Sequence, residues 1–156
     1  METKNGMAAL HGIMQAYADW CKPLCRGLGM PQMAFDILMF LSGNPELCTA
    51  RDINRHQGFK ENILSVNVNK LVSEGYLQRL SVEGDRRKVR LVLTEKAQPI
   101  ITRGKHAQEE FDQLIREGIT REELATFAKC LDIAGENARR IRTMHCSQEL
   151  RDEEHI

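Results

Sequence analysis

The chain has 156 residues and equal numbers of acidic and basic side chains, so its formal net charge is zero. This length suits one compact domain, with or without helical extensions. No apolar run is long enough to span a bilayer, and the N-terminus lacks the apolar core of a signal peptide. We therefore expect a soluble, cytoplasmic protein with no membrane partner.

The apolar residues are mostly aliphatic. Phe, Trp and Tyr make up only 5% of the chain, and the Leu, Ile, Met and Ala that supply most of the apolar content favour helices. The cysteines are odd in number and lack a compact spacing, so we interpret them as free thiols of a reducing compartment. They are Cys21, Cys25, Cys48, Cys130 and Cys146.

The zero net charge conceals a basic centre between acidic ends. Residues 48–96 hold ten Lys and Arg against six Asp and Glu, a net of +4, whereas residues 1–47 have a net of −1 and residues 97–156 a net of −3. A polyanion responds to the charge that faces it rather than to the total. Charge runs are most often solvated faces, so the charge of this segment is evidence for a function only together with the motifs within it.

Two helices are predicted before the basic segment. From Met7 to about Cys25 the apolar residues form a wide stripe, which predicts an amphipathic helix that must bury one face. The glycines of Gly27-Leu28-Gly29 end it. A second helix is predicted from Pro31 until Ser42-Gly43-Asn44-Pro45 breaks the apolar pattern.

A short helix, a glycine turn and a longer helix follow. Thr49 is placed to cap a helix with Asp52 three residues later, and this helix is predicted to run to about Gln57. Gly58 makes the turn. The order is typical of a helix-turn-helix, in which the first helix braces the second against a major groove. A generic helical hairpin remains the alternative at this point.

The longer helix extends from Lys60 to a stop at Gly75, a position suited to a left-handed cap. Its apolar residues recur three and four apart and share one face. The opposite face is small and polar, and its groups can read base edges or hold phosphates. The apolar residues are Leu64, Val68, Leu71 and Val72, and the opposite face holds Asn62, Ser65, Val66, Asn69 and Lys70.

Strand-like alternation replaces the helical period after Gly75. Two strands are predicted, Tyr76 to Val82 and Val89 to Leu93, around a tip at residues 83–88. The tip holds three successive basic residues. A solvated turn is the ordinary interpretation, but such a tip is also a good probe of a minor groove.

These residues resemble the winged helix-turn-helix of the MarR (multiple antibiotic resistance regulator) family of bacterial transcription factors. The resemblance rests on an ordered set of motifs: Leu71, Gly75-Tyr76-Leu77 with Arg79, Asp85-Arg86-Arg87 and Leu93-Thr94-Glu95-Lys96. It implies a mainly α fold with a small β-hairpin wing, an obligate homodimer, a pseudo-palindromic double-stranded DNA operator, and release by a small molecule or an oxidant.

The resemblance and the chemistry of the side chains together assign roles on DNA. Ser65 and Asn69 are the best candidates for base contacts, on a face that also holds Asn62 and Val66. We expect phosphate contacts from basic residues and insertion of two arginines into the minor groove, while Asp85 holds the wing by pairing with an arginine. The phosphate set is Lys60, Lys70, Lys88 and Arg90, and the minor-groove pair is Arg86 and Arg87.

Helices are also predicted beyond the wing. Thr94 is placed to cap a helix with Glu95, but Pro99 implies either a kink or a start nearer Gln98. Gly118 ends this helix, and a capping box, Thr120 with Glu123, begins the last one. We expect helical dimerisation regions at 7–30 and 98–147, a DNA-binding winged helix-turn-helix at 31–97, and a disordered acidic tail at 148–156; a helical cap within one chain is the alternative to dimerisation.

The resemblance implies an effector pocket where the first helix meets the winged domain. Its expected lining is Tyr17, Trp20, Cys21, Met33, Ile37 and Phe40, each of which is also an ordinary core residue. We expect a small aromatic or phenolic effector. A redox sensor at Cys21 and Cys25, activated by Lys22 and Arg26, is the alternative, as is a winged-helix module that binds protein instead of DNA.

Other chemistry has little support in the sequence. The histidines do not fall into a persuasive metal-ligand spacing. Nucleophile elbows, phosphate-binding glycine loops and paired carboxylates are likewise missing from the sequence. We therefore expect neither an enzyme nor a cofactor.

Overall fold

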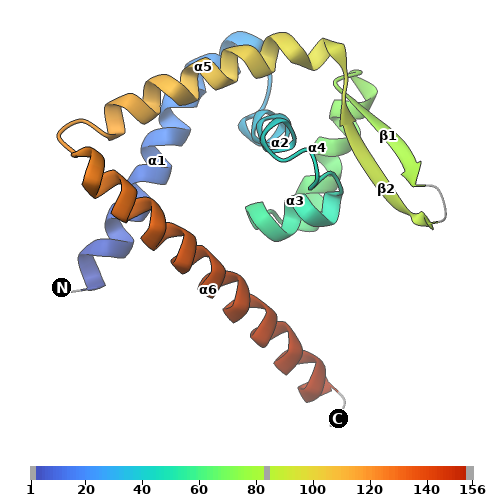
Figure 1. Cartoon of the computed structure of the whole chain (residues 1–156). Coiled ribbons are helices and arrows are strands. Elements are labelled where there is room, and N and C mark those ends of the chain that lie inside the picture. The colour runs from blue at the N-terminus through green and yellow to red at the C-terminus, as the bar shows by residue number, and fades with distance from the viewer. Residues whose placement is uncertain (1–2, 83–84, 154–156) are drawn as a thin grey trace. The chain divides into compact units, whose positions relative to one another are not determined.

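The computed structural model describes residues 3–82 and 85–153, with side chains described for residues 6–81, 89–141 and 144. Their contacts divide the chain into two compact units, residues 1–112 and 113–156. The described residues form six α-helices, one 3-10 helix and a two-stranded antiparallel hairpin, which confirms the predicted mainly α architecture with a β-hairpin wing (Figure 1). No helix among them is long and apolar enough to cross a membrane.

The first unit begins with α1 (Thr3–Leu28) and α2 (Gln32–Gly43). Helix α1 is longer than predicted and contains Pro23, and Pro31 is the N-cap of α2 in extended conformation. The turn between them depends on Gly29, whose φ of 63° is in the left-handed region that favours glycine.

Helices α3 (Ala50–Gln57) and α4 (Glu61–Ser73) form the helix-turn-helix. The predicted capping box is confirmed: the Thr49 hydroxyl accepts from the Asp52 backbone N–H at 3.1 Å, and the Asp52 carboxylate accepts from the Thr49 N–H at 3.0 Å. Gly58 closes α3 with a φ of 68°. The side chain of Asn54 then donates to the carbonyl of Phe59 at 2.5 Å, which fixes the turn into α4.

The wing consists of β1 (Leu77–Val82) and β2 (Asp85–Leu93), paired in antiparallel register from Leu77 with Leu93 to Ser81 with Val89. Its base is tied to the helix-turn-helix on two sides. The backbone N–H of Leu91 donates to the carbonyl of Cys48 at 2.7 Å. On the other side, the Thr94 hydroxyl donates to the carbonyl of Gly75 at 2.6 Å.

The role predicted for Thr94 was therefore partly wrong. Thr94 is the N-cap of the 3-10 helix η1 (Glu95–Ala97), but its side chain makes no capping bond there because the hydroxyl is directed to the end of α4. Helix α5 (Gln98–Ile115) begins at Gln98, one of the two predicted starts. Pro99 thus lies in the first turn, where its missing N–H has no intrahelical partner to lose.

Helix α6 (Arg121–Glu153) belongs to the second unit and begins with the predicted capping box. The Thr120 N–H and the Thr120 hydroxyl both donate to the Glu123 carboxylate, at 2.8 and 2.7 Å. The helix continues to Glu153, so a disordered tail starting at 148 was wrong for residues 148–153; Gln, Glu, Leu and Arg in this segment are all good helix formers. Residues 154–156 lie outside the described residues.

The core of the first unit joins both helices of the helix-turn-helix to α1, α2 and α5. Its largest fully buried side chains come from α2, α3, α4 and β1: Phe35, Ile37, Leu38, Ile53, Leu71 and Leu77. Helix α5 adds Ile100 and Ile101, and α1 adds Cys21 and Cys25. The packing of α2 against α5 passes through Gly104, where a Cβ would lie 3.0 Å from two ring atoms of Phe35 and would also collide with the sulfur of Met39.

Replacing Gly104 with Ala should therefore destabilise the first unit. The added methyl has no space against the fully buried Phe35, and overpacking of this kind costs about 1 to 3 kcal/mol. Chemical denaturation of Gly104→Ala and of the control Gly43→Ala, whose Cβ would meet nothing within 4 Å, measures the difference. Equal free energies of unfolding for the two variants would contradict this packing.

Candidate nucleic-acid interface

Helix α4 has one buried edge and one open face. Leu64, Val68 and Leu71 are 3% or less exposed, because they pack into the core of the first unit. The α4 residues predicted to face DNA lie on the opposite side, and all of them are exposed. The exposed residues are Asn62, Ser65, Val66, Asn69 and Lys70, with Lys60 exposed at the N-cap. Val66 is 65% exposed, a large fraction for an apolar side chain.

Two of the basic residues predicted to contact phosphates, Lys70 and Arg90, already have side-chain partners within the protein. The ammonium of Lys70 lies 3.8 Å from the carboxylate of Glu74, with both side chains nearly half exposed, so the pair is weak. Arg90 was predicted only as a phosphate contact. Its Nε instead donates to the sulfur of Cys48 at 3.1 Å, which commits one edge of the guanidinium to the base of the wing.

The wing tip is shorter than predicted. Asp85 already belongs to β2 and pairs with Val82 across an irregularity in the register, so residues 85–88 continue the strand and are not part of a loop. None of Arg86, Arg87 and Lys88 is a usual turn former, so their sequence does not oppose continuation of the strand. The side chains of Asp85, Arg86, Arg87 and Lys88 lie outside the described residues.

A groove of about 510 Å³ lies between α3, α4 and β1. It brings together Ser65, which was predicted, with Arg51 and Arg79, which were not assigned to DNA. Its lining is Ala50, Arg51, Asn54, Glu61, Leu64, Ser65, Val68 and Arg79. Arg79 lies two residues after the buried Leu77, on the same face of β1, but the sequence offered no signal that it meets α4. It likewise offered none for Arg51 beyond its place in the first turn of α3.

Asn69 and Arg79 are joined across the corner between α4 and β1. An Nη2 hydrogen of Arg79 is donated to Oδ1 of Asn69 at 2.6 Å, and both residues are exposed. The predicted base-reading residue therefore has a partner on the wing.

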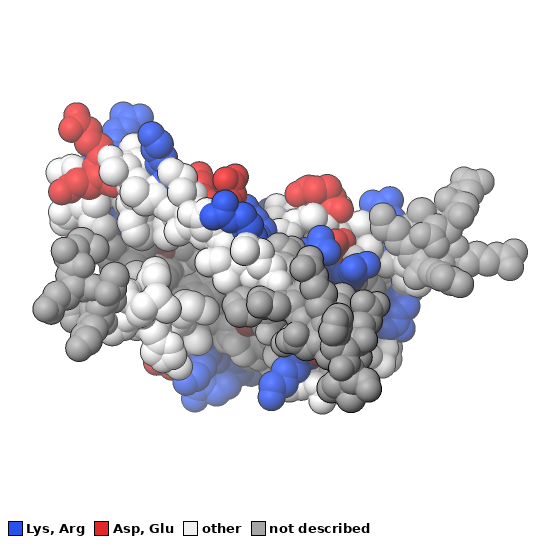
Figure 2. All heavy atoms as spheres, turned by 90° about the horizontal axis from the view of Figure 1, so that it is seen from below, with Lys and Arg blue, Asp and Glu red and all other residues white. Residues whose placement is uncertain are grey.

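Figure 2 shows the described Lys and Arg side chains interspersed with acidic and uncharged residues on the face seen from below. The described residues on this face do not form one continuous basic field.

Comparisons with known proteins agree with this geometry. A family model, described as MarR family, matches residues 28–88. The matched segment contains α2, α3, α4 and β1. A search of curated protein sequences finds no match.

Solved structures extend the likeness over most of the chain. The transcriptional regulator PA3341 is 25% identical, with a TM-score of 0.76 over 85% of this chain and 97% of that one. A MarR transcriptional regulator from Methanosarcina mazei Go1 is 21% identical, with a TM-score of 0.76 over 89% and 99% of the two chains. A protein from Listeria monocytogenes assigned to the same family, solved in complex with a 26mer DNA, is 16% identical, with a TM-score of 0.78 over 86% and 89%.

Helix α1 packs beside α5, where the effector pocket was predicted. The indole N–H of Trp20 donates to the carbonyl of Ala107 at 2.9 Å, and the amide of Gln108 donates to the Tyr17 hydroxyl at 2.8 Å. The rings of Tyr17 and Phe111 meet edge to face with centroids 5.3 Å apart. These contacts hold both aromatic residues on the α5 side of α1.

The predicted lining set is divided between the core and the surface. Cys21, Ile37 and Phe40 are buried and Met33 is partly buried against the same core. A groove of about 630 Å³ runs between α1 and α5, and Trp20 is the one member of the predicted set that lines it. The lining is Asp19, Trp20, Pro23, Leu24, Arg103, His106, Ala107 and Glu110. Helical spacing placed Trp20 on the apolar face of α1, but it could not show which residues of α5 lie opposite.

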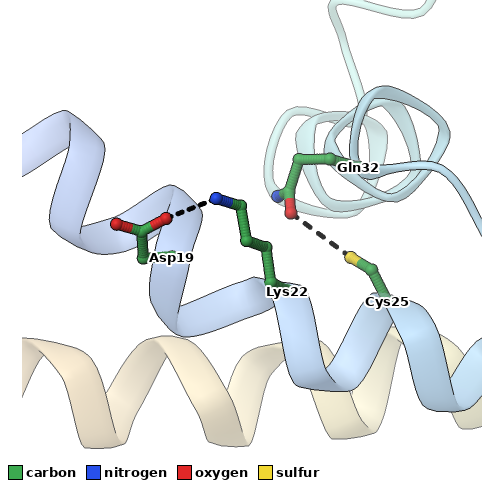
Figure 3. A network of polar contacts seen from close by, with 4 residues as sticks. All are labelled: Asp19, Lys22, Cys25 and Gln32. Carbon is green, nitrogen blue, oxygen red and sulfur yellow. Dashed lines mark hydrogen bonds and ion pairs between the residues drawn. The ribbon is translucent and has the colours of Figure 1, made fainter.

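The thiols of α1 are protected from ionisation. Burial raises the pKa of the Cys25 thiol to about 11, with smaller contributions from Cys21 and from Asp36. Burial also raises the pKa of the Cys21 thiol. The alternative in which Lys22 activates these thiols has no support here, because its ammonium binds Asp19 at 2.6 Å, while the Cys25 sulfur faces Oε1 of Gln32 at 3.4 Å (Figure 3).

Proposed function

We propose that this chain is a homodimeric, sequence-specific DNA-binding transcriptional regulator, acting as a repressor. The single observation that supports this most is the open polar face of α4 within the segment that the MarR family model matches, flanked by a wing whose base is hydrogen-bonded to the same helix-turn-helix. A recognition helix needs a face that is exposed, polar and rigidly held. The DNA complex of the protein from Listeria monocytogenes adds support by analogy.

In this proposal α4 enters the major groove and the wing lies along the neighbouring minor groove. Ser65 and Asn69 read base edges, with Asn62 and Val66 beside them. Lys60, Lys70, Lys88 and Arg90 hold phosphates, and Arg86 and Arg87 enter the minor groove, where the potential is most negative. Arg51 joins the phosphate set because it lines the groove that also contains Ser65.

The dimer is supported by apolar side chains that each unit leaves exposed. In α1, Met7 and Met14 are both 72% exposed, and α6 exposes apolar residues at helical spacing. Apolar surface of this extent on helices is typical of an association surface. We assign residues 7–30 and 98–147 to dimerisation and 31–97 to DNA. The exposed set in the second unit is Leu114, Ile115, Ile119, Phe127, Leu131, Ile133, Ile141 and Met144.

The affinity for an operator duplex should fall steeply with salt. A protein that neutralises six to ten phosphates loses roughly 10³- to 10⁵-fold in affinity between 50 and 200 mM salt, because bound counterions are released. Fluorescence anisotropy on a duplex selected from a random library, against a scrambled duplex of equal length, measures this. A winged-helix module that binds protein would show no preference for the selected duplex at any ionic strength, and that outcome would sink the proposal.

We further propose that a small aromatic or phenolic effector releases the DNA. The groove between α1 and α5 supports this, because its size is typical of small-molecule sites and it combines the Trp20 indole with the Arg103 guanidinium. Such a ligand acts only through its differential affinity, and a shift from mostly bound to mostly free requires roughly 5 kcal/mol between the two states. Oxidation is the weaker alternative, since a thiol pKa of about 11 leaves Cys25 almost wholly protonated at neutral pH.

A panel of phenols and aromatic carboxylates should contain compounds that both quench the fluorescence of Trp20, which is the one Trp of the chain, and release the operator. Equimolar peroxide should leave the complex intact, because the thiolate is the reactive form. Parallel titrations of the wild type and of Cys25→Ser make the comparison. Peroxide release that a thiol reductant reverses, and that Cys25→Ser abolishes, would replace the effector with a redox signal.

A further inference from the structure

The bond between Arg79 and Asn69 links the recognition helix to the wing at the point where both meet the open face. The two atoms, Nη2 of Arg79 and Oδ1 of Asn69, are 2.6 Å apart, a short distance for such a bond. Arg79 pairs with Leu91 in the hairpin, and the neighbouring Leu77 and Leu91 are buried, so the backbone that carries the guanidinium is fixed in the core.

The chemistry of the pair determines how the amide is turned. A guanidinium has hydrogen-bond donors and no acceptor, so it can bind only the oxygen of the Asn69 amide. The amino group of Asn69 then points away from Arg79, and both of its hydrogens can be donated to another partner. A side chain that is exposed and would otherwise sample several rotamers is thereby held in one arrangement.

This arrangement favours some bases over others. The usual pairing of an asparagine with adenine uses both ends of the amide, because the oxygen accepts from N6 while the nitrogen donates to N7. Arg79 already occupies one of the two lone pairs of that oxygen, so only one acceptor position is left for adenine N6. The free amino group suits a base that presents acceptors alone in the major groove, and guanine does so through N7 and O6.

We propose that Arg79 is a positioning residue that presents Asn69 as a hydrogen-bond donor, so that each recognition helix selects a guanine edge at one position of its half-site. This inference rests on the proposed DNA-binding function and adds a specificity-determining pair to it. Arg79 acts through Asn69, and its own guanidinium is not a phosphate contact.

The test begins with wild-type protein and a randomised duplex library, which gives the preferred half-site; failure to enrich any sequence would refute the DNA-binding function itself. Relative affinities are then measured for all four base pairs at each position, for the wild type, Arg79→Ala, Asn69→Ala and the double variant. Thermal unfolding of each variant checks that the fold is retained. Arg51→Ala is the matched control, because it removes one arginine from the same groove.

The expected result is a guanine preference of about tenfold at one position in the wild type. Arg79→Ala and Asn69→Ala should each reduce that preference to twofold or less at the same position, and the double variant should lose no more than either single variant. Arg79→Lys, whose ammonium is also a donor without an acceptor, should keep more of the guanine preference than Arg79→Ala. Asn69→Asp, which still accepts from Arg79 but has no amino group, should shift the preference toward cytosine.

Three results would overturn the inference. The first is additive losses of preference in the double variant, which would mean that the two residues act separately. The second is an unchanged guanine preference in Arg79→Ala with a salt slope reduced by about two per dimer, as for one phosphate contact in each subunit. The third is an Asn69→Asp variant that keeps the wild-type preference. In each case the wild-type selection would still stand, so the DNA-binding function would survive.

Discussion

The open face of α4 depends on the burial of its opposite edge. Leu64, Val68 and Leu71 are packed into a core that also holds Phe35 and Ile53, and full burial of an aliphatic side chain contributes about 1.5 to 3 kcal/mol. Because residues on a helix repeat every 3.6 positions, burying one edge determines which residues remain outside. The placement of every candidate base contact therefore follows from the packing of three apolar residues.

The wing is held to the same helix by polar bonds at the corner that α4 makes with β1. Gly75, with a φ of 79°, permits the sharp exit from the helix, and the Thr94 hydroxyl closes the corner by donating to its carbonyl. Lys96 adds to it by donating to the carbonyl of Glu74 at 2.7 Å and by lying 4.6 Å from the ring centre of Tyr76. A corner bound in this way moves with the recognition helix, so a major-groove and a minor-groove contact would be made together.

Much of this arrangement could be predicted from the sequence, because it depends on local signals. Helical spacing identified the buried edge of α4, and the left-handed glycines at Gly58 and Gly75 marked its boundaries. Contacts between distant residues could not be predicted in the same way. The Thr94 hydroxyl could either accept from the backbone of η1 or donate to the end of α4, and Arg79 meets Asn69 only because the register of the hairpin brings it there. The raised pKa of Cys25 likewise depends on how completely tertiary packing buries the thiol, which helical spacing alone does not determine.

The proposal that two copies of α4 read DNA together is tested most directly by hydroxyl-radical footprinting of the protein on its selected duplex. Two recognition helices related by a two-fold axis are expected to lie roughly 34 Å apart, one turn of DNA. Two symmetric protected patches are expected on one face of the duplex, with centres about 10 base pairs apart and two chains bound. A single protected patch with one chain bound to the selected duplex would contradict it.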